Sequence, residues 1–88
     1  MSQQQPITIY TRGWCGFCHR AKALLQHKGY AFTDIDIEAQ PDQAAVMVER
    51  AGRTSVPQIF VGEHHVGGCD DLFALERAQK LDDLVVQG

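Results

Sequence analysis

The spacing of apolar positions changes several times along the chain, and each change marks a predicted element. Short stretches that alternate apolar with polar residues, or that run together as β-branched and aromatic residues, indicate strands. Stretches in which apolar residues recur at steps of three and four indicate helices. This pattern predicts strands at about residues 7–10, 32–37, 57–61 and 64–66, and helices at about residues 16–28, at 41–52 and from residue 69 or 70 onward, with a last turn at 81–86.

Glycine and proline residues mark the boundaries of these elements. Gly29 stands just past the first predicted helix, where glycine commonly follows a helix end, and Pro41 can occupy the first turn of the next helix. Residues 62–63 have glycine first, as a two-residue type II′ hairpin turn requires, and two glycines at residues 67–68 break the chain before the last long helix. The order β-α-β-α-β-β-α predicts an α/β fold. Its first two strands should be parallel with a right-handed crossover, and its last two should form an antiparallel hairpin.

Length and composition exclude several classes of protein. With 88 residues, 44% of them hydrophobic and 22% charged, the chain has the composition of a folded protein, and we expect one domain spanning residues 1–88. The sequence has no run of about 18 apolar residues, which a membrane helix needs, and residues 1–6 lack the features of a secretory signal. A net charge of −3 argues against nucleic-acid binding. We therefore expect a cytoplasmic protein with no membrane or nucleic-acid partner.

The charges are unevenly distributed along the chain. Residues 1–33 carry four of the eight basic side chains and no acid, whereas residues 34–88 carry the other four and all eleven acids. Cys15 and Cys18 lie in the acid-free part. We expect the local field there to favour an anion.

Cys15 and Cys18 form a C-x-x-C motif, and Cys69 stands far from it. In a reducing compartment such a pair is more often catalytic or metal-binding than structural. Cys15 falls where the first strand ends and the first helix begins, so unpaired backbone N–H groups and the helix dipole favour its thiolate. We predict that Cys15 is the nucleophile. Cys18, one turn further on, should be less exposed, have a higher pKa, and act as the resolving thiol.

A zinc site is the alternative use of this motif. The sequence has no second C-x-x-C and no H-x-x-x-H, which would complete a common zinc ligand set. Cys69 would have to complete it together with one of the histidines His19, His64 or His65. The strand-to-helix position of the motif favours redox chemistry.

Three segments in the same order, residues 15–25, 53–60 and 67–72, resemble glutaredoxins, specifically the short bacterial dithiol type that is glutaredoxin 3-like. The resemblance implies the thioredoxin fold, with a four-stranded mixed sheet of order 2-1-3-4 flanked by helices. It also implies that Pro57 is cis and that the backbone of Val56 pairs with the substrate.

The resemblance further implies a glutathione-dependent oxidoreductase that reduces glutathione mixed disulfides and protein disulfides as a monomer. Because glutathione carries two carboxylates and an ammonium, its site needs cations, backbone donors and an acid. We expect Arg12 and Arg53 to meet one carboxylate, and the N–H groups of Cys69 and Asp70 to meet the other. Asp70 or Asp71 should meet the ammonium, unless both acids merely cap a helix and both arginines are solvated charges. The expected glutathione-binding residues are Arg12, Phe17, Arg53, Val56, Pro57, Gly68, Cys69, Asp70 and Asp71.

One departure from the resemblance leaves two other functions open. Gly16-Phe17 replaces the Pro-Tyr of the dithiol type and matches monothiol glutaredoxins, in which two chains bind a [2Fe–2S] cluster with glutathione. Such a dimer would use Cys15 as its metal ligand, although the retained Cys18 is absent from that class. Trp14-Cys15-Gly16 also resembles thioredoxin, which would make the chain a reductant supplied by a flavoprotein reductase.

Overall fold

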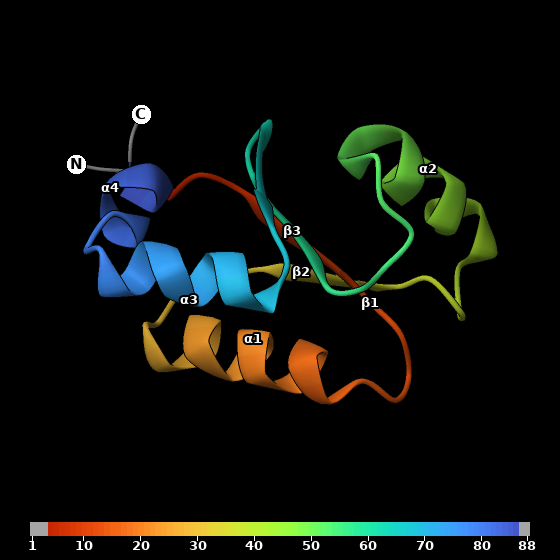
Figure 1. The fold of residues 1–88 in the computed structure, drawn as a ribbon, viewed down its shortest axis with the longest axis horizontal. Helices are drawn as coiled ribbons and strands as arrows, with labels where there is room; N and C mark the ends of the chain where they lie inside the picture. The colour runs from red at the N-terminus through yellow and green to blue at the C-terminus, as the bar shows by residue number, and fades with distance from the viewer. Residues whose placement is uncertain (1–3, 87–88) are drawn as a thin grey trace.

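Four strands form one mixed sheet at the centre of the structure (Figure 1). The computed structural model describes residues 4–86, so the start of the polar segment 1–6 considered above lies outside it. The strands are β1 (Ile7–Thr11), β2 (Thr33–Asp36), β3 (Gln58–Val61) and β4 (His64–Gly67), arranged in the order β2-β1-β3-β4. β1 pairs parallel with β2 and antiparallel with β3, and β4 pairs antiparallel with β3. Order and directions are both as predicted.

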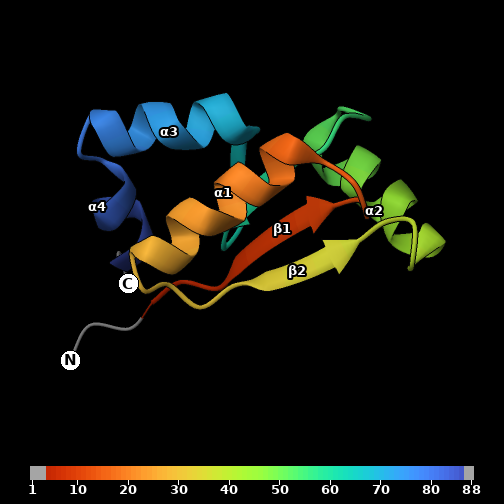
Figure 2. The same ribbon diagram turned by 90° about the horizontal axis from the view of Figure 1, so that it is seen from below.

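The helices cover the sheet unequally. They are α1 (Gly16–His27), α2 (Pro41–Ala51), α3 (Cys69–Arg77) and α4 (Leu81–Val86). α1 and α3 lie side by side against one face, whereas α2 lies apart from them on the other side of the sheet (Figures 1 and 2). α4 is a short helix where the sequence predicted only a last turn. Among the described residues, no helix has both the length and the apolar character needed to cross a membrane.

The alternation of side chains along β1 and β3 divides the core into two clusters. Ile9 and Ile59 point to the face covered by α1 and α3, and both are completely buried. Tyr10 and Phe60, the next residues along each strand, point the other way and pack on Met47 of α2. Tyr10 is 2% exposed and fills this smaller cluster.

Two backbone features match the expectations from sequence. Gly62 has a φ of +58°, the positive value that a type II′ turn requires at its first central position. The peptide bond between Val56 and Pro57 is cis. This bond immediately precedes β3, so Val56 lies just before the first residue of a central strand, near the start of α1.

Candidate functional site

Cys15 is the N-cap residue of α1. Its backbone is extended, with φ −155° and ψ 109°, and its Sγ accepts a hydrogen bond from the backbone N–H of Cys18 at 3.1 Å. The first turn of α1, residues 16–19, contains no acid. The sulfur therefore receives a backbone donor and faces the positive end of the helix dipole, and both stabilise a thiolate over a thiol.

Cys18 has the opposite environment. Its side chain is 1% exposed, whereas that of Cys15 is half-buried. Burial, followed by the hydrogen bond with Cys15, raises the pKa of Cys18 to about 12. Cys18 is therefore a thiol near neutral pH, which confirms the predicted difference in exposure and the predicted high pKa of the second cysteine.

The charges around the dithiol differ from those expected. The backbone N–H of Gly13 donates to Glu38 at 3.1 Å, and Lys22 forms a 2.8 Å ion pair with Asp34. Burial opposes the charge of Asp34, but hydrogen bonds from Lys22 and Thr11 outweigh it and lower the pKa of that carboxyl. The acid-free stretch of sequence does not stay free of acids in space, because the parallel pairing of β1 with β2 brings residues 34–38 beside residues 11–22. The helix start is the local feature that favours an anion at Cys15.

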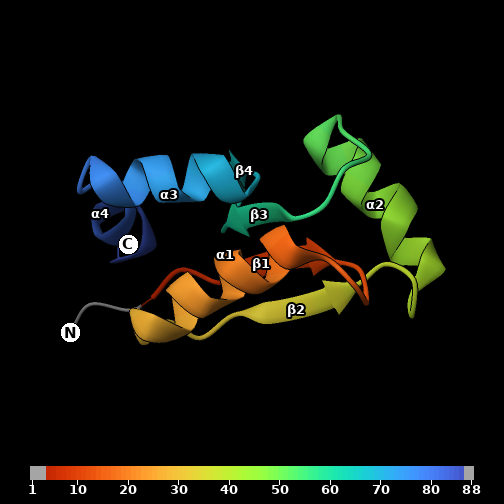
Figure 3. The same ribbon diagram turned by 60° about the horizontal axis from the view of Figure 1, so that its bottom comes forward.

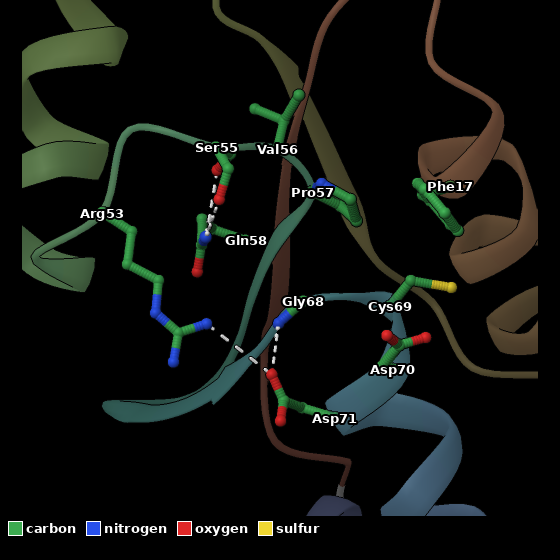
Figure 4. A pocket seen from close by; sticks show the side chains of 10 residues that line it. All are labelled: Phe17, Arg53, Ser55, Val56, Pro57, Gln58, Gly68, Cys69, Asp70 and Asp71. Carbon is green, nitrogen blue, oxygen red and sulfur yellow. Dashed lines mark hydrogen bonds and ion pairs between the residues drawn. The ribbon is translucent and has the colours of Figure 1, made fainter.

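A groove runs between the loop before β3 and the start of α3 (Figure 4). It contains every residue expected for glutathione binding except Arg12. The residues that line it are Phe17, Arg53, Ser55, Val56, Pro57, Gln58, Gly68, Cys69, Asp70 and Asp71. The fold therefore gathers residues from three separate segments of the sequence into one concave surface.

The two adjacent acids at the start of α3 have different roles. Asp71 Oδ2 accepts a hydrogen bond from the N–H of Gly68 at 2.9 Å and lies 3.7 Å from Arg53 Nη1 (Figure 4). It therefore caps α3, as one of the interpretations from sequence stated. Asp70 is exposed and lines the groove.

Gly67 makes this cap sterically feasible. Its φ is +117°, and a Cβ at this position would lie 2.3 Å from Asp71 Oδ2. Any other residue would therefore combine a strained backbone with a collision. Gly67, two residues before α3, is therefore a structural requirement of the cap.

A second hollow adjoins the groove and contains Cys15. Arg12, Trp14, Cys15 and Gly16 line it, and it shares Phe17, Ser55 and Val56 with the groove. Arg12 therefore lines a different hollow from Arg53, which lines the groove. Trp14 is 86% exposed and Phe17 is 57% exposed, so Phe17 is a surface aromatic beside the sulfur and not a packing residue.

Sequence reasoning missed Ser55 and Gln58. Gln58 is 1% exposed, and its Nε2 donates to the backbone oxygen of Ser55 at 3.0 Å and to Ser55 Oγ at 3.3 Å. The available signal was an amide side chain within an otherwise apolar strand, because such a residue must find internal partners.

The third cysteine is a buried thiol. Cys69 is 5% exposed, and burial raises its pKa. In the part of the chain that the structure describes, no three side chains of His, Cys, Asp or Glu gather in a way that could hold a metal ion. The zinc alternative therefore gains no support from the geometry.

Comparison with known proteins decides the family. A family model described as Glutaredoxin matches residues 7–66, which include both cysteines of the motif and the cis proline. The chain belongs to the glutaredoxin family. With the Cys15 and Cys18 pair, it is a dithiol member and a thiol–disulfide oxidoreductase.

Its relatives agree with the bacterial type inferred from the motifs. The chain is 56% identical to a glutaredoxin of Pseudomonas aeruginosa over 91% of its length and 95% of the relative's. It is 48% identical to glutaredoxin 3 of Escherichia coli, over 90% and 95% of the two chains. Among solved structures, it resembles a buckwheat glutaredoxin–glutathione complex with a TM-score of 0.84 and 28% identity, covering 92% of this chain and 76% of the other. The fold is therefore the thioredoxin fold of glutaredoxins.

Proposed function

We propose that this glutaredoxin uses glutathione to reduce glutathione mixed disulfides and protein disulfides. The observation that carries the proposal is the position of Cys15. Its sulfur lies at a helix start and accepts a hydrogen bond from the N–H of Cys18, and Cys15 lines a hollow that shares Phe17, Ser55 and Val56 with the groove.

The groove offers the chemical groups that glutathione needs. Arg53 can bind the glycine carboxylate through its guanidinium donors, and the N–H groups of Cys69 and Asp70 at the start of α3 can bind the γ-glutamyl carboxylate. Asp70 is the acid left to meet the ammonium, because Asp71 caps the helix. The backbone of Val56 can pair with the tripeptide backbone. The likeness to a glutaredoxin solved with glutathione supports this assignment.

The reaction on a glutathione mixed disulfide requires Cys15 alone. Its thiolate attacks the glutathione sulfur, forming a Cys15–glutathione disulfide and releasing the protein thiolate, which takes up a proton. A second glutathione, as its thiolate, attacks the glutathione sulfur of this intermediate. Oxidised glutathione leaves, and the Cys15 thiolate is restored.

A protein disulfide requires both cysteines. Cys15 attacks one sulfur and releases the other as a thiol, leaving a mixed disulfide between Cys15 and the protein. Cys18 then loses its proton and attacks the Cys15 sulfur, which releases the reduced protein and leaves a Cys15–Cys18 disulfide. Two glutathione molecules reduce that bond and leave as oxidised glutathione.

These steps predict different phenotypes for the two cysteines. Cys15→Ser should abolish both activities, whereas Cys18→Ser should retain deglutathionylation and lose protein-disulfide reduction, because only the latter needs a resolving thiol. Glutathione-coupled turnover on a glutathionylated peptide and on a protein disulfide measures both.

Two results would contradict the proposal. Loss of both activities in folded Cys18→Ser would overturn the assigned roles. Reduction of the enzyme by a flavoprotein thioredoxin reductase, but not by glutathione, would support the thioredoxin-like alternative.

The environment of Gly16 favours a second candidate, a [2Fe–2S] cluster shared by two chains. A Cβ at Gly16 would meet no atom within 4 Å, so the space beside Cys15 is open. Cys18 and Cys69 are buried, which leaves Cys15 as the thiol that could serve as a ligand, with glutathione supplying the others. Reconstitution with iron, sulfide and glutathione without oxygen, followed by absorption spectroscopy and gel filtration, tests it. A colourless monomer would remove this candidate.

We further propose that residues 1–88 act as one domain, as a monomer in the cytoplasm. The three cysteines are free thiols, which suits a reducing compartment.

A further inference from the structure

Gln58 connects the hairpin to the loop that shapes the groove. It is the first residue of β3 and lines the groove, and its amide is joined on one side to Ser55. On the other side, its Oε1 lies 2.7 Å from Nε2 of His65 on β4. A continuous chain of hydrogen bonds therefore runs from His65 through Gln58 to Ser55, which precedes Val56 and the cis proline.

The direction of each hydrogen bond in this chain is fixed by chemistry. The backbone oxygen of Ser55 can only accept, so Gln58 must present its NH₂ group to it. The amide oxygen of Gln58 then faces His65 and can only accept as well. His65 therefore carries its proton on Nε2 and donates to Gln58.

Aromatic packing holds the His65 ring in position. The ring stacks on Phe60, with centroids 4.8 Å apart and planes 23° from parallel. Phe60 is 2% exposed, and the guanidinium of Arg50 lies 4.0 Å from its ring centroid. The His65 ring, the first donor in this series of hydrogen bonds, is thus held against the smaller core cluster.

The loop that contains Ser55 is the part of the groove that needs to be held in place by these hydrogen bonds. Residues 52–57 belong to neither α2 nor β3, and Ser55 is exposed. Ser55 and Val56 nevertheless line both the groove (Figure 4) and the adjoining hollow that contains Cys15. A loop that is ordered before binding saves the entropy that ligand binding would otherwise cost.

We propose that His65 is a positioning residue for glutathione, acting through Gln58 to hold the Ser55–Pro57 segment in its binding shape. This inference rests on the proposed function, because it assigns glutathione to the groove. It concerns a residue that lies outside the groove lining and bears no part of the chemistry. Its effect should therefore fall on substrate affinity and spare the sulfur.

The test compares variants that separate the hydrogen bond from the ring. His65→Phe keeps an aromatic ring on Phe60 and removes the donor, whereas His65→Gln keeps an N–H donor and removes the ring. His64→Phe makes the same exchange at the exposed neighbouring position. Steady-state reduction of a glutathionylated peptide and the alkylation rate of Cys15 by iodoacetamide are measured for each.

We expect His65→Phe to raise KM for the glutathionylated peptide about fivefold, the effect of one lost hydrogen bond, with kcat and the alkylation rate unchanged. His65→Gln should restore most of the affinity, and His64→Phe should behave as wild type. Gln58→Leu should raise KM at least as much. Adding His65→Phe to Gln58→Leu should change KM no further, because the hydrogen bonds that connect His65 to Ser55 are already lost.

The outcomes distinguish this inference from the proposed function. An unchanged KM in His65→Phe, an equal defect in His65→Gln, or additive effects in the double variant would overturn the inference alone. If His65→Phe does not fold, the KM of His65→Gln is compared with that of Gln58→Leu. Equal increases in KM for these two variants would overturn the inference, and an increase in Gln58→Leu alone would support it. Wild type that turns over with no glutathione would remove the proposed function and this inference together.

Discussion

At the scale of single residues, the site depends on two thiols one helical turn apart in contrasting surroundings. Cys15 receives a hydrogen bond from the backbone N–H of Cys18, yet the Cys18 side chain lies in the core with its pKa raised to about 12, first by burial and then by its contact with Cys15. Cys18 therefore keeps its proton near neutral pH. Negative charge leaving Cys15, when its disulfide forms, removes one of the causes that hold the Cys18 proton in place.

The imidazole of His65 titrates independently of the two cysteines and makes the stability of the protein depend on pH. Burial, followed by the positive charge of Arg53, lowers its pKa below the ordinary value of 6.5, with smaller effects from Asp71, His64 and Arg50. The folded protein thus disfavours the charged ring, while the unfolded chain does not. The stability that this provides is complete above about pH 6.5 and decreases as the pH falls from there toward the lower folded-state pKa.

We predict that the free energy of unfolding falls between pH 7.5 and pH 5 and that His65→Gln reduces this dependence. Urea denaturation followed by circular dichroism across this range measures it. Asp34 does not interfere, because its lowered pKa places its titration below 3.8. Parallel slopes for wild type and His65→Gln would show that other groups cause the dependence.

At the scale of elements, the start of α3 is where structure and binding depend on the same atoms. The Asp71 carboxylate caps the helix at Gly68 and lies beside Arg53, and Cys69 and Asp70, the first residues of α3, line the groove. The cap therefore also orients the backbone donors assigned to glutathione.

Gly67→Ala should destabilise the protein by about 1–3 kcal/mol, because alanine is strained at a φ of +117° and its Cβ would collide with the Asp71 carboxylate. Urea unfolding gives the change. Gly16→Ala is the matched control, since a Cβ there meets no atom within 4 Å and alanine favours a helix. Equal free energies of unfolding for Gly67→Ala and wild type would contradict the prediction, because the Asp71 side chain would then be able to move away from the added Cβ at no cost.

At the scale of the whole molecule, the spacing of apolar residues predicted the arrangement of helices and strands, because the two core clusters require that spacing. The alternation of Ile9 with Tyr10 and of Ile59 with Phe60 follows from burying both faces of the central strands. The dithiol was identified equally well, since a strand-to-helix junction is a local property of the chain.

Contacts between distant segments were beyond sequence reasoning. The acids that neighbour the dithiol come from β2 and its following loop, and their place depends on strand register. The contact of His65 with Gln58 depends on a hairpin with a register shift between Ile59 and Phe60. That Arg12 and Arg53 line two different hollows likewise depends on how distant segments pack.

The first and last described parts of the chain are tied together. The N–H of Gln5 donates to the backbone oxygen of Val85 in α4 at 2.7 Å, and Figure 3 shows α4 beside the end of α3 and away from the start of α1. A reporter domain fused to either terminus would thus stand away from the sulfur. A short linker joining the termini would allow circular permutation, with new ends opened in a distant loop.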